Sequence, residues 1–334
     1  MKRVLIAILL FAGFSLANAQ VVEQDLTPRG QVKPEQFNVV EPPAWDRELP
    51  FVERDTCTLS MDLYLPADTC AKHPCAVFIY GGGFVNNNQR EKYVKKYCRR
   101  LADAGFVTVA TDYRLGLKGV KSNSILTLAK NLDKAMQASA EDLFSAVSYL
   151  LNNAEELQID PEQIILIGSS AGAMTALQAD YELGNRTALA ADMPEGFRFA
   201  AVVSFSGAIF SNHGKCKWTV QSPAPTLFFH GTSDELVTYD KIQFFKMGLF
   251  GTNALVERFE KFDYPYMCIR FDNRFHEVAA FMNTCFDQTM GFIEQFVRQK
   301  KNWQIDITVT DPDMDIAKPW SFTAKDIYSK DSKF

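Results

Sequence analysis

Short blocks of consecutive apolar residues alternate along the chain with segments in which apolar residues recur at helical spacing. Residues 164–167 are Ile-Ile-Leu-Ile, a run typical of a strand buried on both faces of a parallel sheet. Similar blocks predict strands at residues 58–65, 76–80, 106–111, 200–204, 226–229 and 267–271. Helical spacing predicts helices at residues 93–104, 139–152, 239–247, 253–262 and 278–299, and one that begins just after residue 172. This alternation indicates an α/β fold with a mostly parallel central sheet and helices on both faces.

The helix at residues 139–152 has a candidate start signal. Ser139 is followed three residues later by Asp142, which resembles a capping box with aspartate as the acid. Apolar residues between positions 143 and 150 then recur on one helical face. We expect residues 112–137, which precede this helix, to form a long loop with short helices.

Residues 168–172 are Gly-Ser-Ser-Ala-Gly and stand between a predicted strand and a predicted helix. A sharp turn of this G-x-S-x-G type can project the hydroxyl of Ser170 from a strained backbone, because Gly168 and Gly172 carry no colliding side chains. The following helix directs its N-terminal dipole at negative charge that forms there. A glycine and serine turn without chemistry is the alternative, and the strand before and helix after favour a nucleophile.

Three glycines follow the predicted strand at residues 76–80, in the run Tyr80-Gly81-Gly82-Gly83-Phe84. Without Cβ atoms, this backbone can turn its N–H groups toward a developing oxyanion, and Ala171 would add a further donor. The alternatives are a loop that needs positive φ angles and a phosphate-binding loop. The sequence lacks both the Gly-Lys-Ser/Thr of a P-loop and the G-x-G-x-x-G of a dinucleotide site.

A serine nucleophile needs a histidine, and the chain has His73, His213, His230 and His276. Where the serine turn exists, the acid and then the histidine follow the serine along the chain. This order excludes His73 and favours His276, the only histidine beyond the acidic turn at residue 234. His213 is expected in a surface loop or at the rim of the site.

The candidate acid is Asp234, in the run His-Gly-Thr-Ser-Asp that follows the predicted strand at residues 226–229. The carboxyl ends of parallel strands meet at one edge of a sheet, which is where ligands bind. Glu235 and Asp240 remain weaker alternatives for the acid.

Composition limits the classes of partner. The formal net charge is −5, and it becomes −7 if Lys2 and Arg3 are removed with a leader, which argues against nucleic acid or an anionic membrane as the main partner. The sequence has no Cys-x-x-Cys motif or histidine-rich cluster, so we expect no metal and no cofactor. We also expect no membrane span.

The ends of the chain differ from its middle. Residues 1–19 combine a basic start, an apolar run and Ala-Asn-Ala, which predicts a cleaved signal peptide and a secreted or periplasmic protein. We expect a surface arm at residues 20–50, the catalytic domain at residues 51–299 and a surface tail at residues 300–334. Seven cysteines in an exported chain suggest some disulfides, and the closely spaced Cys70 and Cys75 could close a small loop.

The three motifs around Gly82, Ser170 and Asp234, together with His276, resemble the α/β-hydrolase family, in its esterase and lipase branch. The resemblance covers roughly residues 59–298. It implies an oxyanion hole formed by the N–H groups of Gly82, Gly83 and Ala171. It also implies a two-step acyl-enzyme mechanism without a cofactor.

The sequence therefore predicts a secreted serine hydrolase that cleaves carboxylic esters with a Ser170–His276–Asp234 triad. The expected substrate is a small-molecule or polysaccharide-linked ester, and acetyl, feruloyl, short acyl and lipid groups all remain open. A serine peptidase of the same fold is the alternative enzyme. Ser-Ala-Gly after Gly168-Ser169, rather than a Tyr-Gly-Gly run, favours esters. A hydrolase-fold binding protein without catalysis is the remaining alternative.

Overall fold

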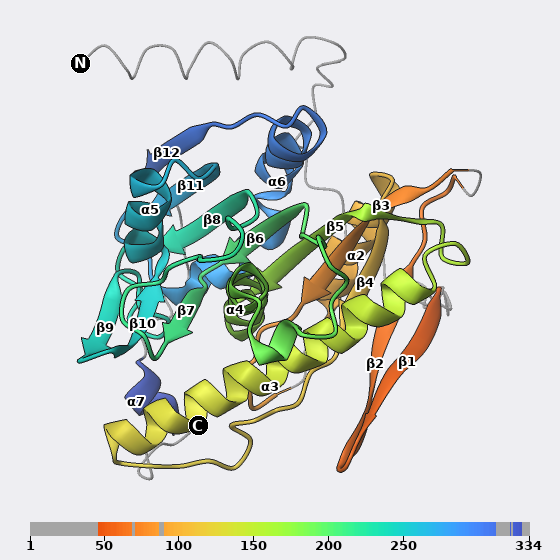
Figure 1. Cartoon of the computed structure of the whole chain (residues 1–334). Coiled ribbons are helices and arrows are strands. Elements are labelled where there is room, and N and C mark those ends of the chain that lie inside the picture. Colours follow the sequence, from red (N-terminus) through yellow and green to blue (C-terminus); the bar gives the residue numbers. More distant parts are fainter. Residues whose placement is uncertain (1–45, 69–70, 87–89, 312–320, 322, 329–334) are drawn as a thin grey trace, which may run out of the picture. The chain divides into compact units, whose positions relative to one another are not determined.

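A computed structural model describes residues 46–68, 71–86, 90–311, 321 and 323–328. Its main feature is a nine-stranded sheet with the order β1-β2-β4-β3-β5-β6-β8-β11-β12 (Figure 1). These strands are β1 (Arg47–Arg54), β2 (Cys57–Tyr64), β3 (His73–Ile79), β4 (Val107–Thr111), β5 (Ile159–Ser169), β6 (Ala201–Phe205), β8 (Thr226–Gly231), β11 (Tyr266–Phe271) and β12 (Gln304–Val309). A second sheet has the order β7-β10-β9, with β7 (Ala208–Ser211), β9 (Lys241–Phe244) and β10 (Met247–Gly251).

Within the large sheet, the seven strands β4, β3, β5, β6, β8, β11 and β12 run parallel to one another. Strand β1 is antiparallel to β2, and β2 is antiparallel to β4. Strands β6 and β8 are buried throughout, and so are nearly all of β3 and residues 164–169 of β5, as expected for a sheet that is covered on both faces. Ile79 pairs with Gly168, and Gly168 pairs with Ser204. Because this register aligns the ends of β3, β5 and β6, the loops that follow these strands start side by side.

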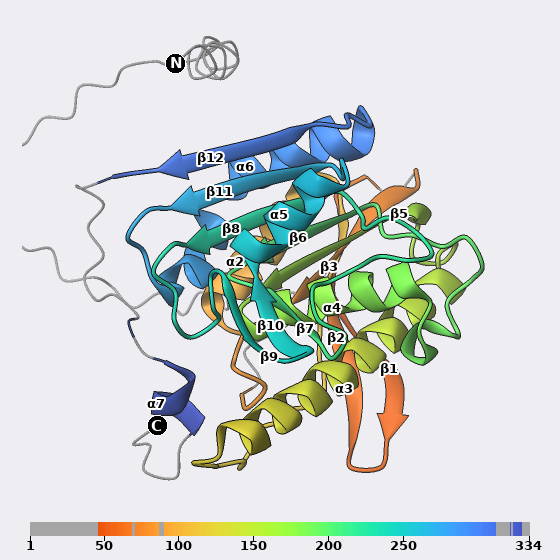
Figure 2. The same cartoon turned by 60° about the vertical axis from the view of Figure 1, so that its left-hand side comes forward.

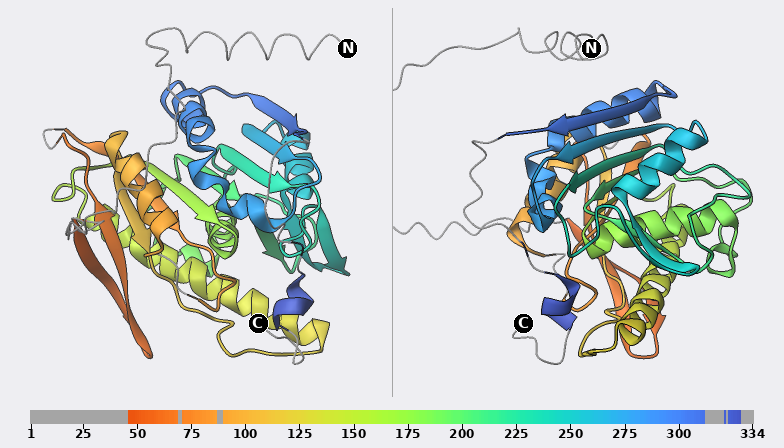
Figure 3. Two further views of the ribbon diagram at one scale, coloured as in Figure 1. Left: turned by 180° about the vertical axis from the view of Figure 1, so that it is seen from behind. Right: turned by 90° about the vertical axis from the view of Figure 1, so that its left-hand side faces the viewer.

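Helices cover both faces of the large sheet. α3 (Ile125–Asn152), α4 (Ala171–Asn185) and α5 (Thr252–Lys261) lie on the face nearest the viewer in Figures 1 and 2. The opposite face, seen from behind in Figure 3, carries α2 (Lys92–Asp103) and α6 (Phe286–Phe292). The remaining helical segments are η1 (Ala188–Ala190), η2 (His276–Asn283), η3 (Ile293–Arg298) and α7 (Ala324–Tyr328). The α/β architecture predicted from the apolar pattern is thus confirmed.

The helix predicted at residues 239–247 is wrong. The chain forms the hairpin of β9 and β10 there, and β10 also pairs with β7. All four residues of β9 are exposed, so no apolar stripe faces a core. A strand partner from another part of the chain decides the structure of this segment, as is common for sequences of mixed propensity.

The capping box predicted at Ser139 is also wrong. One helix, α3, runs through residues 125–152, and its N-cap is Ser124, whose side chain accepts a hydrogen bond from the Thr127 N–H. Ser139 and Asp142 lie buried within this helix. The Asp142 carboxylate accepts hydrogen bonds at 2.9 Å from the guanidinium groups of Arg54 and Arg114, so the aspartate serves an ion-pair network instead of a helix start.

The segment from residue 300 differs from the predicted surface tail. β12 adds a strand to the sheet by pairing in parallel with β11, and α7 packs partly buried side chains against the core. The predicted closing helix at residues 278–299 consists of η2, α6 and η3 in succession. At the other end, β1 starts inside the expected arm at residues 20–50, and the expected signal peptide lies outside the described residues. Within the described residues, no helix is both long and apolar enough to cross a membrane.

The expectation of disulfides differs from the structure. Among the described residues, six cysteines carry free thiols, and five of them are buried: Cys75, Cys98, Cys216, Cys268 and Cys285. All five belong to the hydrophobic core. Cys75 therefore does not close the suggested loop with Cys70, which itself lies outside the described residues.

Candidate active site

The serine turn connects β5 to α4 through a strained residue. Ser170 has φ 52° and ψ −120°, a backbone conformation that non-glycine residues rarely adopt. A Cβ at Gly168 would lie 2.3 Å from the carbonyl oxygen of Gly172, and one at Gly172 would lie 2.1 Å from that of Ile79. Only glycine fits at both positions, so the Gly-x-Ser-x-Gly spacing follows from the close approach of strand, turn and helix.

Two loops meet beside this turn because of another glycine. A Cβ at Gly231 would lie 2.3 Å from the carbonyl oxygen of Arg274. The Thr232 N–H donates to the Phe271 carbonyl at 3.0 Å, and the Ser233 N–H donates to the Arg274 carbonyl at 2.9 Å. These contacts bring the loop after β8 against the loop after β11, which carry the predicted acid and base.

The structure brings Ser170, His276 and Asp234 into one hydrogen-bonded chain. Ser170 Oγ lies 2.7 Å from His276 Nε2, and His276 Nδ1 lies 2.7 Å from Asp234 Oδ2. His276 and Asp234 are almost fully buried. A carboxylate on Nδ1 favours the tautomer in which Nε2 can accept the serine proton.

The Asp234 carboxylate is fully partnered. Its Oδ1 accepts hydrogen bonds from the backbone N–H groups of Leu236 at 3.0 Å and Val237 at 3.1 Å, and its Oδ2 also lies 3.2 Å from His230 Nε2. Burial by itself raises the pKa of Asp234, but the hydrogen bonds from His230 and His276 outweigh burial and hold this pKa well below its usual range. The carboxylate therefore stays ionised in any mildly acidic or neutral solution.

His230 is a neighbour of the acid that the sequence analysis left without a role. It is fully buried, with Nε2 3.0 Å from the Val237 carbonyl and Nδ1 2.8 Å from Thr252 Oγ1. Since a carbonyl can only accept, Nε2 carries the hydrogen and faces both Val237 and Asp234. The position of His230 four residues before Asp234 was the available signal, but its spacing alone does not show a contact.

The glycine loop passes directly beside the serine turn. A Cβ at Gly81 would lie 3.2 Å from Ser170 Cβ. The Gly82 carbonyl accepts hydrogen bonds from the N–H groups of Val85 at 3.0 Å and Asn86 at 3.1 Å. In a trans peptide the C=O and N–H point in opposite directions, so the Gly83 N–H points away from this turn.

The predicted oxyanion donors are open within the described part of the chain. There, no acceptor is bonded to the backbone N–H of Gly82, Gly83 or Ala171. Gly82 has φ +132° and Gly83 φ +62°, backbone angles that favour glycine.

The other residues considered for the site do not join the hydrogen-bonded chain of Ser170, His276 and Asp234. Glu235 and Asp240 are exposed, and Asp240 accepts a hydrogen bond from the Asn253 side chain. Ser169 Oγ donates to the Ala279 carbonyl at 2.7 Å, away from His276. His213 is exposed, as expected.

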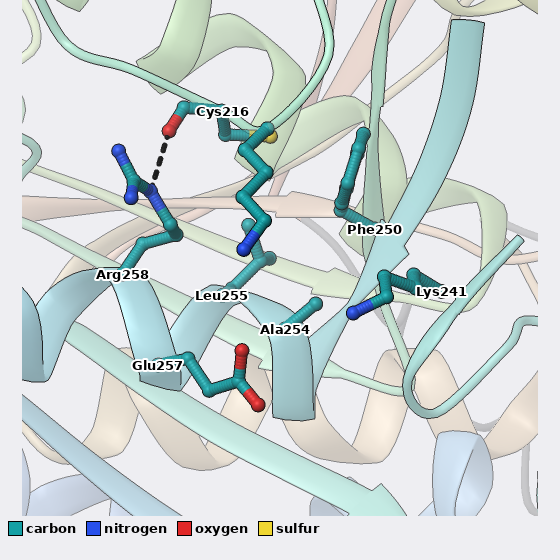
Figure 4. A pocket seen from close by; sticks show the side chains of 8 residues that line it. Cys216, Lys241, Phe250, Ala254, Leu255, Glu257 and Arg258 are labelled. Carbon is teal, nitrogen blue, oxygen red and sulfur yellow. Dashed lines mark hydrogen bonds between the residues drawn. The ribbon is translucent and has the colours of Figure 1, made fainter. Parts of the chain in front are cut away.

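A pocket outside the triad lies against α5 and β10 (Figure 4). Its lining includes Cys216, Phe250 and Arg258, and Arg258 donates to the Cys216 carbonyl. Ser170, Asp234 and His276 are not among the residues that line it. Among the described residues, no group of three or more histidine, cysteine or acidic side chains is arranged to hold a metal ion.

Comparison with known sequences identifies relatives for part of the chain. The family model described as BD-FAE matches residues 61–217, a range that includes the glycine loop and Ser170. Lipase 2 of Geotrichum candidum is 28% identical over 149 residues, which make up 43% of this chain and 25% of the lipase. The fumonisin B1 esterase of Sphingopyxis macrogoltabida is 29% identical over 100 residues, 30% of this chain and 18% of the esterase. The chain thus spans a quarter or less of the length of these relatives.

Solved structures share the fold over most of the chain. Thermogutta terrifontis esterase 2 phosphonylated by cyclosarin superposes with a TM-score of 0.55 at 20% identity, covering 77% of this chain and 94% of the esterase. The propionate-bound form of the same esterase gives a TM-score of 0.55 at 20% identity, with coverages of 78% and 96%. At 20% identity, this structural similarity shows that the chain shares the fold of these esterases.

Proposed function

We propose that this chain, which has the fold of the esterase structures and resembles esterases and lipases in sequence, hydrolyses carboxylic esters with Ser170 as the nucleophile. The observation that carries this proposal is the hydrogen-bonded chain from Ser170 through His276 to Asp234, at the strained turn after β5. The names of the relatives, which include esterases and lipases, support the same chemistry.

In the first step, Ser170 Oγ attacks the ester carbonyl carbon while His276 Nε2 takes the serine proton. The carbonyl oxygen becomes an oxyanion, which the N–H groups of Gly82, Gly83 and Ala171 stabilise. Asp234 stabilises the imidazolium. The tetrahedral intermediate then collapses: the bond to the alcohol oxygen breaks, His276 gives that oxygen its proton, and the acyl group stays on Ser170.

In the second step, water replaces the alcohol. His276 removes a proton from the water as its oxygen attacks the acyl carbon, and the same three N–H groups bind the new oxyanion. Collapse of this intermediate breaks the bond to Ser170 Oγ, which regains its proton from His276. The carboxylic acid leaves, and the enzyme returns to its starting state.

The substrate is proposed as a small-molecule or polysaccharide-linked ester. A serine peptidase is the second candidate, since the same triad and oxyanion donors also cleave amides. We further propose that residues 1–19 direct export and are removed.

The test is reaction of the full mature chain with a fluorophosphonate probe, followed by turnover of p-nitrophenyl, sugar and peptide substrates. We expect labelling at Ser170 and turnover of esters in preference to amides. Ser170→Ala should lose both, with a fall in kcat of about 10⁶, as for loss of a triad serine. An unlabelled parent chain would refute the proposed chemistry, and retained labelling in Ser170→Ala would place the nucleophile elsewhere.

A further inference from the structure

The glycine loop is contacted by a residue from the far end of the chain. Tyr328, in α7, donates a hydrogen bond from its hydroxyl to the Gly83 carbonyl at 2.7 Å, across 245 residues of sequence. Tyr328 is buried, with 8% of its surface exposed. Burial raises the pKa of its hydroxyl to about 12, so the hydroxyl remains a donor.

α7 is tied to the loop after β4 by two further bonds. Lys121 Nζ donates to the Ile327 carbonyl at 2.6 Å, and the Ser122 N–H donates to the Tyr328 carbonyl at 2.9 Å. These bonds hold the backbone on either side of the Tyr328 ring. The segment is therefore anchored independently of the hydroxyl that reaches Gly83.

Two tyrosine hydroxyls bracket the three glycines. Tyr113 donates to the Tyr80 carbonyl at 3.0 Å, just before the glycines, and Tyr328 donates to the last of their carbonyls, that of Gly83. The rings of Tyr80 and Tyr113 stack at 4.7 Å, and Phe84 packs edge-on against Tyr113. The loop is thus fixed at both ends by side chains from outside it.

The contact at Gly83 matters because glycine backbone rotates freely. The peptide before Gly83 is held through the Gly82 carbonyl, and the peptide after it is held through the Tyr328 hydroxyl. With both neighbouring peptides fixed, the Gly83 N–H has one direction. A Cβ at Gly83 would lie 2.6 Å from Tyr328 Oη, so the tyrosine also accounts for the glycine.

We propose that Tyr328 is a positioning residue that holds the Gly83 N–H in the direction required for oxyanion binding. This role rests on the proposed function of the glycine loop. Through this role, α7 would influence catalysis although none of its contacts described above is with Ser170, His276 or Asp234. Tyr328 acts through the loop backbone and does not itself contact the reacting atoms.

The decisive variant is Tyr328→Phe, which keeps the ring and removes the donor. Loss of a whole oxyanion donor lowers kcat by about 10²–10³. In Tyr328→Phe the Gly83 N–H is still present but is no longer held in one direction, so kcat should fall by less, about tenfold. KM should stay within twofold because the hydroxyl does not contact the substrate. The rate constant for fluorophosphonate labelling should fall by a similar factor, whereas labelling should still reach one probe per chain.

Tyr266→Phe is the matched control. Tyr266 is also buried, and its hydroxyl bonds the Glu260 carboxylate at 3.0 Å, far along the sequence from the glycine loop. This variant loses one tyrosine hydrogen bond as well, and we expect its kcat and labelling rate to stay within twofold of the parent. Thermal unfolding of both variants compares their stability separately from their kinetics.

Lys121→Met provides a second test if Tyr328→Phe folds poorly. It removes one anchor of α7 and leaves the Tyr328 hydroxyl in place, so kcat should fall by a smaller factor, about twofold to fivefold by the same reasoning. If Tyr328→Phe folds and keeps the parent's kcat and labelling rate, the positioning role is overturned and the proposed function is not. If Tyr328→Phe does not fold, the same result in a folded Lys121→Met overturns the role. A parent chain that does not label at all overturns the proposed function, and the role of Tyr328 falls with it.

Discussion

The serine turn and the glycine loop follow neighbouring buried strands, β5 and β3, yet different contacts hold them. The serine turn is fixed by its own glycines and by α4, which starts at the next residue. The glycine loop is fixed by hydroxyls of Tyr113 and Tyr328, which lie far away in sequence. The proposed nucleophile, Ser170, is therefore placed mainly by its own turn and helix, whereas the glycine loop also depends on contacts from distant parts of the chain. Substitutions should affect the two regions differently.

After loss of the nucleophile itself, the largest expected effect is at the acid. Asp234→Asn should lower kcat by about 10⁴, because an amide favours the wrong imidazole tautomer while keeping the shape of the side chain. Steady-state kinetics near neutral pH measure this change. Glu235→Gln and Asp240→Asn are the controls and should stay within a few-fold of the parent. A collapse of activity in either control, with an active Asp234→Asn, would move the acid.

The next effect tests the glycine loop directly. Gly82→Ala and Gly83→Ala should each lower kcat by about 10²–10³ with a small change in KM, because the added Cβ would meet Asn86 O at 2.4 Å or Tyr328 Oη at 2.6 Å. Gly105→Ala is a matched control, since Gly105 also has positive φ but nothing within 4 Å of its Cβ position. We expect Gly105→Ala to lower the free energy of unfolding and to leave kcat unchanged. Changes in KM alone at Gly82 and Gly83 would indicate a substrate-binding loop.

A smaller effect is expected at His230. Hydrogen bonds to charged groups contribute about 1.5–3 kcal/mol, and His276 and two backbone N–H groups still hold Asp234 without His230. His230→Phe should therefore lower kcat by about tenfold. Thr252→Val, which removes the bond to the other ring nitrogen, should change kcat by less than twofold. Equal losses in the two variants would mean that His230 acts through general packing.

His230 should also affect the acid stability of the protein. The pKa of Asp234 lies below its unfolded value because of His230 and His276, so the ionised carboxylate stabilises the fold above its unfolded pKa of about 4. This stabilisation is lost as the pH falls through the folded pKa. Removing His230 raises that folded pKa, so unfolding midpoints of His230→Phe should decline at a higher pH than those of the parent.

The smallest effect on activity is expected at Asp180, a buried residue of α4 whose carboxylate accepts a hydrogen bond from the Ala224 N–H. Burial raises the pKa of Asp180 to about 7, although the Ala224 N–H bond and the Arg198 charge oppose the rise. An unfolded aspartate titrates near pH 4, so this carboxyl makes stability fall as the pH rises from about 4 to about 7. Asp180→Asn should flatten this fall in unfolding midpoints and leave kcat within twofold. A pH dependence equal to that of the parent would contradict the assignment.

The apolar pattern predicted the central strands because their residues are buried on both faces, as at residues 164–167. It failed where a distant partner decides the structure. The β9–β10 hairpin depends on pairing with β7, and β12 depends on pairing with β11. Asp142 looked like a helix cap, since its partners Arg54 and Arg114 could not be identified from local sequence.

The candidate site divides in the same way. Chain order and strand ends predicted Ser170, Asp234 and His276 as a triad, and the structure places these three side chains in one hydrogen-bonded chain, because the loops after parallel strands converge at one edge. The contact of His230 with Asp234 depends on a tight turn, which spacing alone does not reveal. Tyr328 gave no signal, because no local pattern links it to Gly83.

The separate burial of the cysteine thiols has a practical consequence. Of the six described cysteines, Cys57 at the start of β2 is exposed, while Cys75, Cys98 and Cys268 lie in β3, α2 and β11. A thiol reagent should modify the exposed Cys57 rapidly. It should modify each buried thiol only when the strand or helix that carries it unfolds locally. Mass spectrometry after timed alkylation would then report, element by element, how often each part of the core becomes accessible to solvent.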